Sequence, residues 1–186
     1  RTGTEKDRTK RNGGKLLGEY DENFAGYYAR VFGKLGTLER ASWGLGVEYA
    51  SFSAENARFE DESDVPESGD DLKLVATYSF DGKNPASAVP EGFAGEAGIE
   101  KSLKLAGGDY DYFKYWIQAK GYAPLRRFKS FGSSEEPVSV AARVKFGSSS
   151  GYLPERAEYY AGGSDTLRGY EGGEFSGSST LISNFE

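Results

Sequence analysis

The chain has 186 residues, enough for one domain with a buried core, and a formal net charge of −6. It contains neither cysteine nor histidine, which excludes disulfides, thiol nucleophiles, and catalysis or metal binding by histidine. The acidic balance disfavours a nucleic acid partner.

Apolar and polar residues alternate with a period of two along much of the chain, whereas helical periodicity is poor. In 138–146 one face is apolar and the other carries Arg143 and Lys145, a pattern that suits lipid on one side and water on the other. No apolar run of 18 or more residues occurs, so a transmembrane helix is not expected. The pattern predicts about eight strands, each of roughly 9–12 residues, over 15–21, 25–35, 41–50, 72–81, 93–105, 113–120, 138–146 and 178–186.

The segments between these strands carry turn and loop residues. Residues 54–70 are acidic and contain Pro66, 81–92 form a Pro/Gly-rich turn, Gly107-Gly108-Asp109 forms a short hairpin turn, and 126–137 are polar. The acidic residues within 61–71 lack EF-hand spacing, so a solvated outer loop is favoured over a calcium site. Lys101 falls on the apolar side of 93–105, which requires a position near a membrane edge where its ammonium reaches water.

Alternation alone is also typical of a soluble β-sandwich, and without a further motif we would favour that interpretation. The deciding segment is a loop of about thirty residues, from Gly147 to about Gly177, since loops of this length are usually functional or disordered. Its tyrosines can pack and its glycines permit sharp turns. If the loop folds into a lumen, Arg168 needs a carboxylate partner, and Glu186 lies on the face opposite Phe185. The alternative is an exposed arginine with no specific partner.

The stretch from Tyr159 to Tyr170 resembles the sixth extracellular loop of the BamA/TamA superfamily of outer-membrane β-barrel proteins. Gly162-Gly163 match the glycine pair of that loop, and Leu167, Arg168, Gly169 and Tyr170 match its arginine-bearing tip. The turn from Tyr78 to Gly92, and the segments 107–110, 112–114 and 122–125, are also similar to the family. The resemblance implies that the loop folds back into the barrel, where Arg168 contacts acidic residues of the inner wall, with Glu186 as one of them.

The resemblance implies an all-β fold: an antiparallel transmembrane β-barrel that crosses a bacterial-type outer membrane many times. Residues 1–186 would be part of one outer-membrane β-barrel domain, a partial barrel of about eight strands corresponding to the fifth to twelfth of sixteen. We expect the periplasmic POTRA repeats, the first and closing strands and a second inner-wall acid to lie outside these residues, in a longer protein.

The function implied is the assembly and insertion of outer-membrane proteins. The expected partners are outer-membrane lipids, unfolded outer-membrane or secreted client proteins, and accessory periplasmic or lipoprotein subunits. No enzymatic activity, metal or cofactor is expected in this chain. Two alternatives keep the barrel, as a two-partner secretion pore or as the membrane anchor of a patatin-type phospholipase whose G-x-S-x-G motif would lie upstream. A soluble all-β domain is the third alternative.

Overall fold

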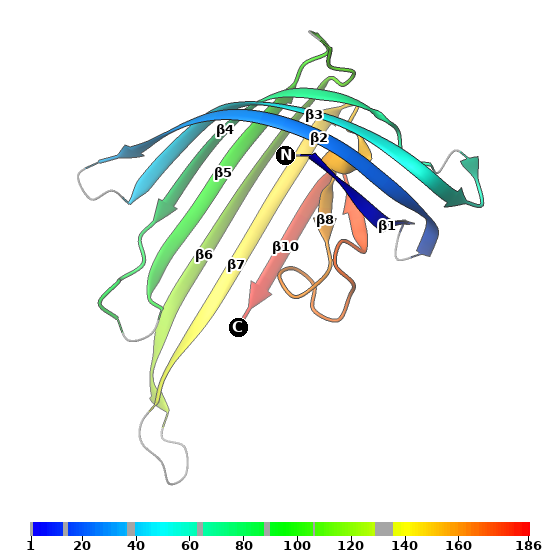
Figure 1. Ribbon diagram of the computed structural model, residues 1–186. Helices are drawn as coiled ribbons and strands as arrows, with labels where there is room; N and C mark the ends of the chain where they lie inside the picture. The colour runs from blue at the N-terminus through cyan, green and yellow to red at the C-terminus, as the bar shows by residue number, and fades with distance from the viewer. Residues whose placement is uncertain are drawn as a thin grey trace.

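The computed structural model describes residues 2–12, 15–36, 40–62, 65–87, 90–105, 107–128 and 136–186. Most of them form one antiparallel eight-stranded sheet in the order β1-β2-β3-β4-β5-β6-β7-β10. The sheet arches over a concave side (Figure 1). Its strands are β1 (Thr2–Asn12), β2 (Lys15–Leu35), β3 (Ala41–Phe59), β4 (Gly69–Asp81), β5 (Gly92–Ser102), β6 (Tyr112–Phe128), β7 (Glu136–Gly151) and β10 (Ser179–Phe185).

The convex face of the sheet is apolar and open. Cross-strand register aligns the aliphatic sides of neighbouring strands, so that Ala97 pairs with Ile117 and Ile117 pairs with Phe146. Ile117 is 54% exposed and Leu181 is 74% exposed. A continuous exposed apolar face of this kind is typical of a wall that contacts lipid rather than water. The expected all-β partial barrel is therefore confirmed, and the β-sandwich interpretation is wrong for this sheet.

The concave face carries charged side chains that pair across strands. Lys73 Nζ on β4 lies 3.5 Å from a carboxylate oxygen of Glu48 on β3 and 3.5 Å from one of Glu100 on β5. Arg30 on β2 also pairs with Glu48. The apolar and polar sides predicted for each strand place these charged residues on the concave face. The strand register then sets positive and negative side chains beside one another in a row along the inner wall.

Two predictions about the strands at the N-terminal side are wrong. Residues 15–21 and 25–35 belong to one strand, β2, and residues 2–12, which show no clear alternation, form β1. The sequence divides β2 because Asp21, Glu22 and Asn23 are three consecutive polar residues. The pairing of β2 with β3 shifts register at the same place, between Glu19 and Asp21, and the extra residue lies in β3. Opposite this shift Asn56 has φ +52°, and Asn56 Nδ2 donates a hydrogen bond to Asp21 at 2.8 Å. A bulge bends the strand without ending it.

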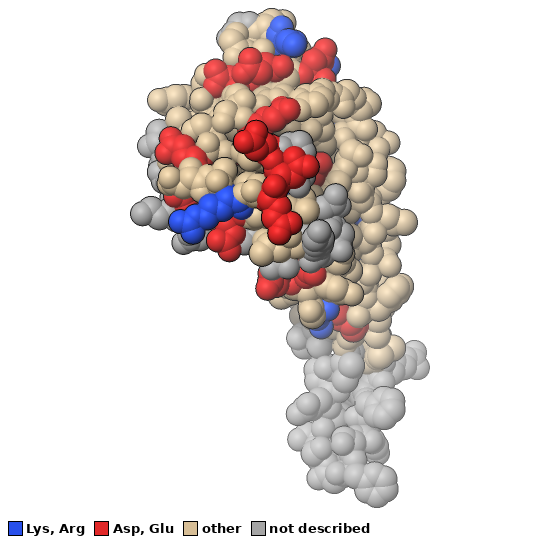
Figure 2. Space-filling model, turned by 90° about the vertical axis from the view of Figure 1, so that its right-hand side faces the viewer, with Lys and Arg blue, Asp and Glu red and all other residues tan. Residues whose placement is uncertain are grey.

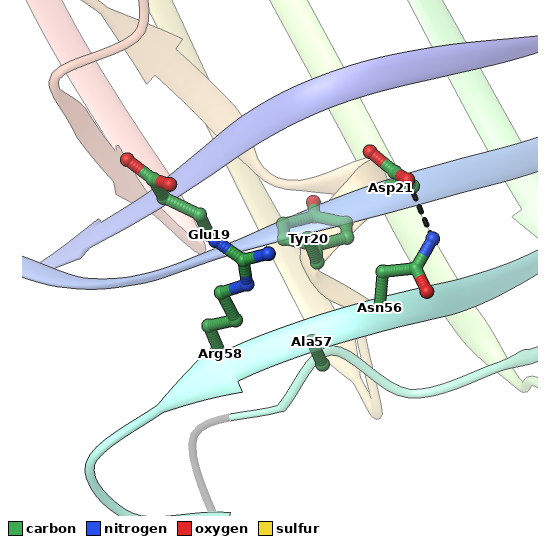
Figure 3. A pocket seen from close by; sticks show the side chains of 6 residues that line it. All are labelled: Glu19, Tyr20, Asp21, Asn56, Ala57 and Arg58. Carbon is green, nitrogen blue, oxygen red and sulfur yellow. Dashed lines mark hydrogen bonds between the residues drawn. The ribbon is translucent and has the colours of Figure 1, made fainter.

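The bulge forms a small polar hollow (Figure 3), in which Tyr20 lies between Arg58 and the Asp21–Asn56 pair. Because pairing continues past it, β3 extends to Phe59 and the predicted acidic loop of 54–70 shortens to 60–68.

Asp and Glu side chains outnumber Lys and Arg on the face shown in Figure 2. Among the described residues, no cluster of three or more acidic side chains could hold a metal ion.

Of the other predicted connections, one keeps its predicted length and the rest do not. The link of 81–92 agrees with the structure, since β4 ends at Asp81 and β5 begins at Gly92. The hairpin turn predicted at 107–109 is a longer connection between Ser102 and Tyr112. Strands β6 and β7 extend into the predicted loop of 126–137, of which 129–135 lie outside the described residues. Lys101 is the penultimate residue of β5 and pairs with Asp111, so its ammonium lies at a strand end as its position on the apolar face requires.

Within the described part of the chain, none of the helical segments has the length and apolar character that crossing a membrane would require.

Candidate functional site: an arginine-bearing loop on the concave face

The connection between β7 and β10 is a folded loop of residues 152–178, slightly shorter than the sequence predicts. It contains a 3-10 turn, η2 (Glu155–Ala157), and two short strands, β8 (Tyr159–Ala161) and β9 (Phe175–Gly177). The two strands pair with each other in an antiparallel sheet. Their mutual pairing satisfies backbone groups that a buried loop would otherwise leave without partners. In Figure 1 this loop lies beneath the arch of the main sheet.

The glycines of the motif allow the backbone to fold tightly. Gly162, Gly163 and Gly169 have φ values of +125°, +85° and +93°, a region that residues with a Cβ rarely adopt. A Cβ on Gly162 would also lie 2.1 Å from the carbonyl oxygen of Glu171. Thr166 Oγ1 accepts a hydrogen bond from Gly162 N at 2.7 Å and donates one to Gly162 O at 2.8 Å. The hydrogen bonds between Gly162 and Thr166 therefore close a tight turn at the start of the motif.

The tip of the motif lies beside the last strand of the sheet. Arg168 Nη2 donates a hydrogen bond to Glu186 Oε1, and the side chains of the two residues are 70% and 57% exposed. Leu167 is half-buried. Tyr170 is half-exposed, and its ring meets Phe175 edge-on with centroids 5.1 Å apart. The structure thus brings Arg168 and Glu186 together, while Leu167, Gly169 and Tyr170 form the turn that presents the arginine.

Two residues that the sequence does not connect with the loop hold its backbone next to the tip. Asn184 Nδ2, on β10, donates a hydrogen bond to Thr166 O at 2.8 Å. Arg143 Nη2, on β7, donates to Asp165 O and also to Asn184 Oδ1, the latter at 2.8 Å. These contacts join β7, β10 and the loop. The alternation of 138–146 indicated that Arg143 faces the polar side, but its partner follows only from the pairing of Arg143 with Asn184 across the two strands.

The part of the loop next to β7, residues 152–161, is called the root here. Tyr159 packs on the inner wall, where its hydroxyl donates to Tyr115 O at 2.6 Å and contacts Ser148 O at 3.1 Å. Burial disfavours the phenolate and raises the pKa of Tyr159 to about 12. Lys114 Nζ donates to Ala157 O at 2.6 Å and lies 4.5 Å from the centroid of the Tyr159 ring, within range of a cation–π interaction.

Aromatic residues of β3, of β6 and of the connection before β6 pack against the root. Tyr110 and Tyr112 form a buried cluster with Phe52 of β3, and Leu153 and Ala157 of the root pack on this cluster. The ring of Tyr110 is stacked on that of Phe52 with centroids 5.7 Å apart. Burial raises the pKa of Tyr110 to about 12. The loop is therefore held along its length by hydrogen bonds at the tip and by both packing and hydrogen bonds at the root.

Comparison with known proteins bears on the family and the fold of the chain. The family model described as "Omp85 superfamily domain" matches residues 6–183. Among solved structures, the chain is similar to BamA from Haemophilus ducreyi lacking POTRA domains 1-3, with 19% sequence identity and a TM-score of 0.63 over 83% of this chain. The match covers 31% of the BamA chain, so this chain spans about a third of that structure. None of the curated proteins compared with the sequence matches it.

Proposed function

We propose, since this chain belongs to the Omp85 superfamily, that it is part of the barrel of a factor that assembles and inserts other proteins into a bacterial-type outer membrane. The chain has the features of an Omp85-type outer-membrane β-barrel, with an apolar convex face and a charged concave face. The observation that carries the proposal is the loop docked on the concave face with Arg168 bonded to Glu186. This role requires no catalytic residues or cofactor in these residues.

The proposal extends to the domain and its partners. Residues 1–186 would form part of one barrel domain, whose convex face contacts outer-membrane lipids. Unfolded outer-membrane or secreted proteins would be the clients, and periplasmic or lipoprotein subunits would be accessory partners. A docked loop supports such a role because its tip is held by exposed and half-buried polar contacts, which can be exchanged without unfolding the wall.

Replacing Arg168 by alanine is expected to slow client folding by roughly twofold to fivefold, since an exposed ion pair contributes modestly to the position of the loop. The measurement uses the full-length protein in liposomes and follows folding of a urea-denatured outer-membrane β-barrel client by its heat-modifiable mobility on gels. The double variant Arg168→Glu/Glu186→Arg should recover part of what each single reversal loses.

Arg58→Ala is the matched control, because Arg58 is an exposed arginine on β3 at the bulge, and it should leave the folding rate unchanged. Equal losses in the single and double reversals would contradict a role for the Arg168–Glu186 pair. If the unmodified full-length protein exports a polypeptide across the liposome membrane but does not accelerate client folding, the secretion-pore alternative replaces the assembly role. A G-x-S-x-G domain encoded upstream would instead support the phospholipase anchor.

A further inference from the structure

The root of the loop reaches the opposite side of the concave face. Arg156, in η2, lies 134 residues from Glu22 on β2, yet its Nη1 donates a hydrogen bond to Glu22 Oε1 at 2.6 Å. Glu22 is only 4% exposed. A buried carboxylate is costly unless a cation or hydrogen-bond donors compensate its charge, and Arg156 supplies both charge and a donor from the loop.

The guanidinium of Arg156 also lies on two aromatic rings of the inner wall. Its Cζ is 5.2 Å from the ring centroid of Phe24 on β2 and 5.8 Å from that of Phe52 on β3. Both distances are within the range of cation–π attraction. A planar guanidinium can stack flat on an aromatic face while donating to a carboxylate, whereas an ammonium has no plane that can stack. The site therefore favours arginine over lysine.

The neighbouring residue extends the contact to the first strand. Glu155 Oε2 lies 3.0 Å from Lys10 Nζ on β1. Ala157, on the other side of Arg156, packs on the cluster that contains Phe52. Three consecutive loop residues thus contact β1, β2 and β3, whereas the tip of the loop contacts β7 and β10 through Arg143 and Asn184.

We infer that Arg156 is the centre of a second anchor of the loop, and that the loop is a strut across the concave side that ties β1–β3 to β7 and β10. This inference rests on the contacts of residues 155–157 and of the tip, and it is independent of the assembly role proposed above. Arg156 is a positioning residue: it fixes the root through Glu22, Phe24 and Phe52. The first anchor is the Arg168–Glu186 pair at the tip, and both of its members are exposed. The second anchor differs in chemistry, because Glu22 in the Arg156–Glu22 pair is nearly buried.

The test is hydrogen exchange of the full-length protein in lipid, read by mass spectrometry for residues 153–161 and 163–170 separately. Arg156→Glu should accelerate exchange in 153–161 by about tenfold, because it places two carboxylates together at a nearly buried position. The double variant Arg156→Glu/Glu22→Arg should return most of the protection. Arg156→Lys should give intermediate protection, because it keeps the charge but loses the planar stacking.

Glu22→Gln provides a variant of unchanged shape in case charge reversal prevents folding, and it should also accelerate exchange in 153–161. Arg168→Ala serves as the matched control: it should accelerate exchange in 163–170 and leave 153–161 protected. Unchanged exchange in 153–161 in both Arg156→Glu and Glu22→Gln would overturn the inference. An equal acceleration over every strand of the sheet would also overturn it, since it would show general destabilisation rather than release of an anchor.

Discussion

Replacing Asp71 by leucine is expected to lower the free energy of unfolding by about 2–4 kcal/mol, because it removes the acceptor of the buried Tyr112 hydroxyl and leaves the Ser102 hydroxyl only its longer contact with Tyr110 O at 3.2 Å. Asp71, on β4, accepts hydrogen bonds from Ser102 Oγ at 2.6 Å and from Tyr112 OH at 2.8 Å. Asp71 is 6% exposed, and Ser102 and Tyr112 are 0% and 1% exposed. Water therefore cannot replace the lost carboxylate without a rearrangement of the wall.

The contacts of Asp71 join three strands at the end of the sheet where the root of the loop packs. Ser102 is the last residue of β5 and Tyr112 is the first residue of β6, and Tyr112 belongs to the aromatic cluster on which Leu153 and Ala157 lie. Loss of the carboxylate is expected to loosen both the connection between β5 and β6 and the support of the loop. A buried polar network of this kind stabilises only when every member has a partner.

Urea unfolding of the full-length protein in detergent micelles, followed by tryptophan fluorescence, measures this effect. Asp71→Asn should cost less than Asp71→Leu, because the amide oxygen still accepts one hydrogen bond. Glu62→Leu is the control, since Glu62 is exposed in the loop between β3 and β4, and it should not shift the unfolding midpoint. Equal stability of Asp71→Leu and the unmodified protein would show that the hydroxyl groups find other acceptors.

Replacing Gly147 by alanine is expected to displace Tyr159 from the inner wall and release the root of the loop. A Cβ at Gly147 would lie 2.5 Å from Tyr159 Cε1, 2.7 Å from Cζ and 2.9 Å from the hydroxyl oxygen. The ring has little freedom to move away, because its hydroxyl bonds to Tyr115 O and Ser148 O and Lys114 lies over its face. We expect a loss of about 1–3 kcal/mol, as for other overpacked interiors.

Gly121→Ala is the matched control, because Gly121 also lies within a strand, β6, but a Cβ there meets nothing within 4 Å. Hydrogen exchange over 158–161 and the thermal unfolding midpoint should change in Gly147→Ala and remain unchanged in Gly121→Ala. Tyr159→Ala removes the ring that Gly147→Ala displaces. Tyr159→Ala should therefore lower the unfolding midpoint less in the Gly147→Ala variant than in the unmodified protein. If the two substitutions are additive, Gly147 does not act through Tyr159.

Much of the fold was accessible from the sequence because its signals are local. The two-residue period in 138–146 places Arg143 and Lys145 on one face whatever the partner strand is, and the resemblance of 159–170 to a known loop identified the family that the match over residues 6–183 confirms. The β1 strand was missed because residues 2–12 are polar throughout. The single β2 strand was divided because Asp21, Glu22 and Asn23 are three consecutive polar residues.

For the loop, the sequence indicated the arginine and the acid but not the rest of their surroundings. Arg168 and Glu186 are in contact, and their role in function stays a prediction. Arg143 and Asn184 lie 41 residues apart, and no motif links either of them to the loop backbone. Arg156 has the appearance of an ordinary charged loop residue, since its partner Glu22 lies at the other end of the chain.

The sequence by itself determined the alternating faces of the strands and the family, because side-chain direction in a strand and the glycine pattern of a turn depend only on neighbouring residues. The tertiary structure alone decided which side chains hold the loop. Strand register and the curvature of the sheet bring Glu22, Phe24 and Phe52 to Arg156, and register is set by cooperative pairing along whole strands rather than by any residue in isolation.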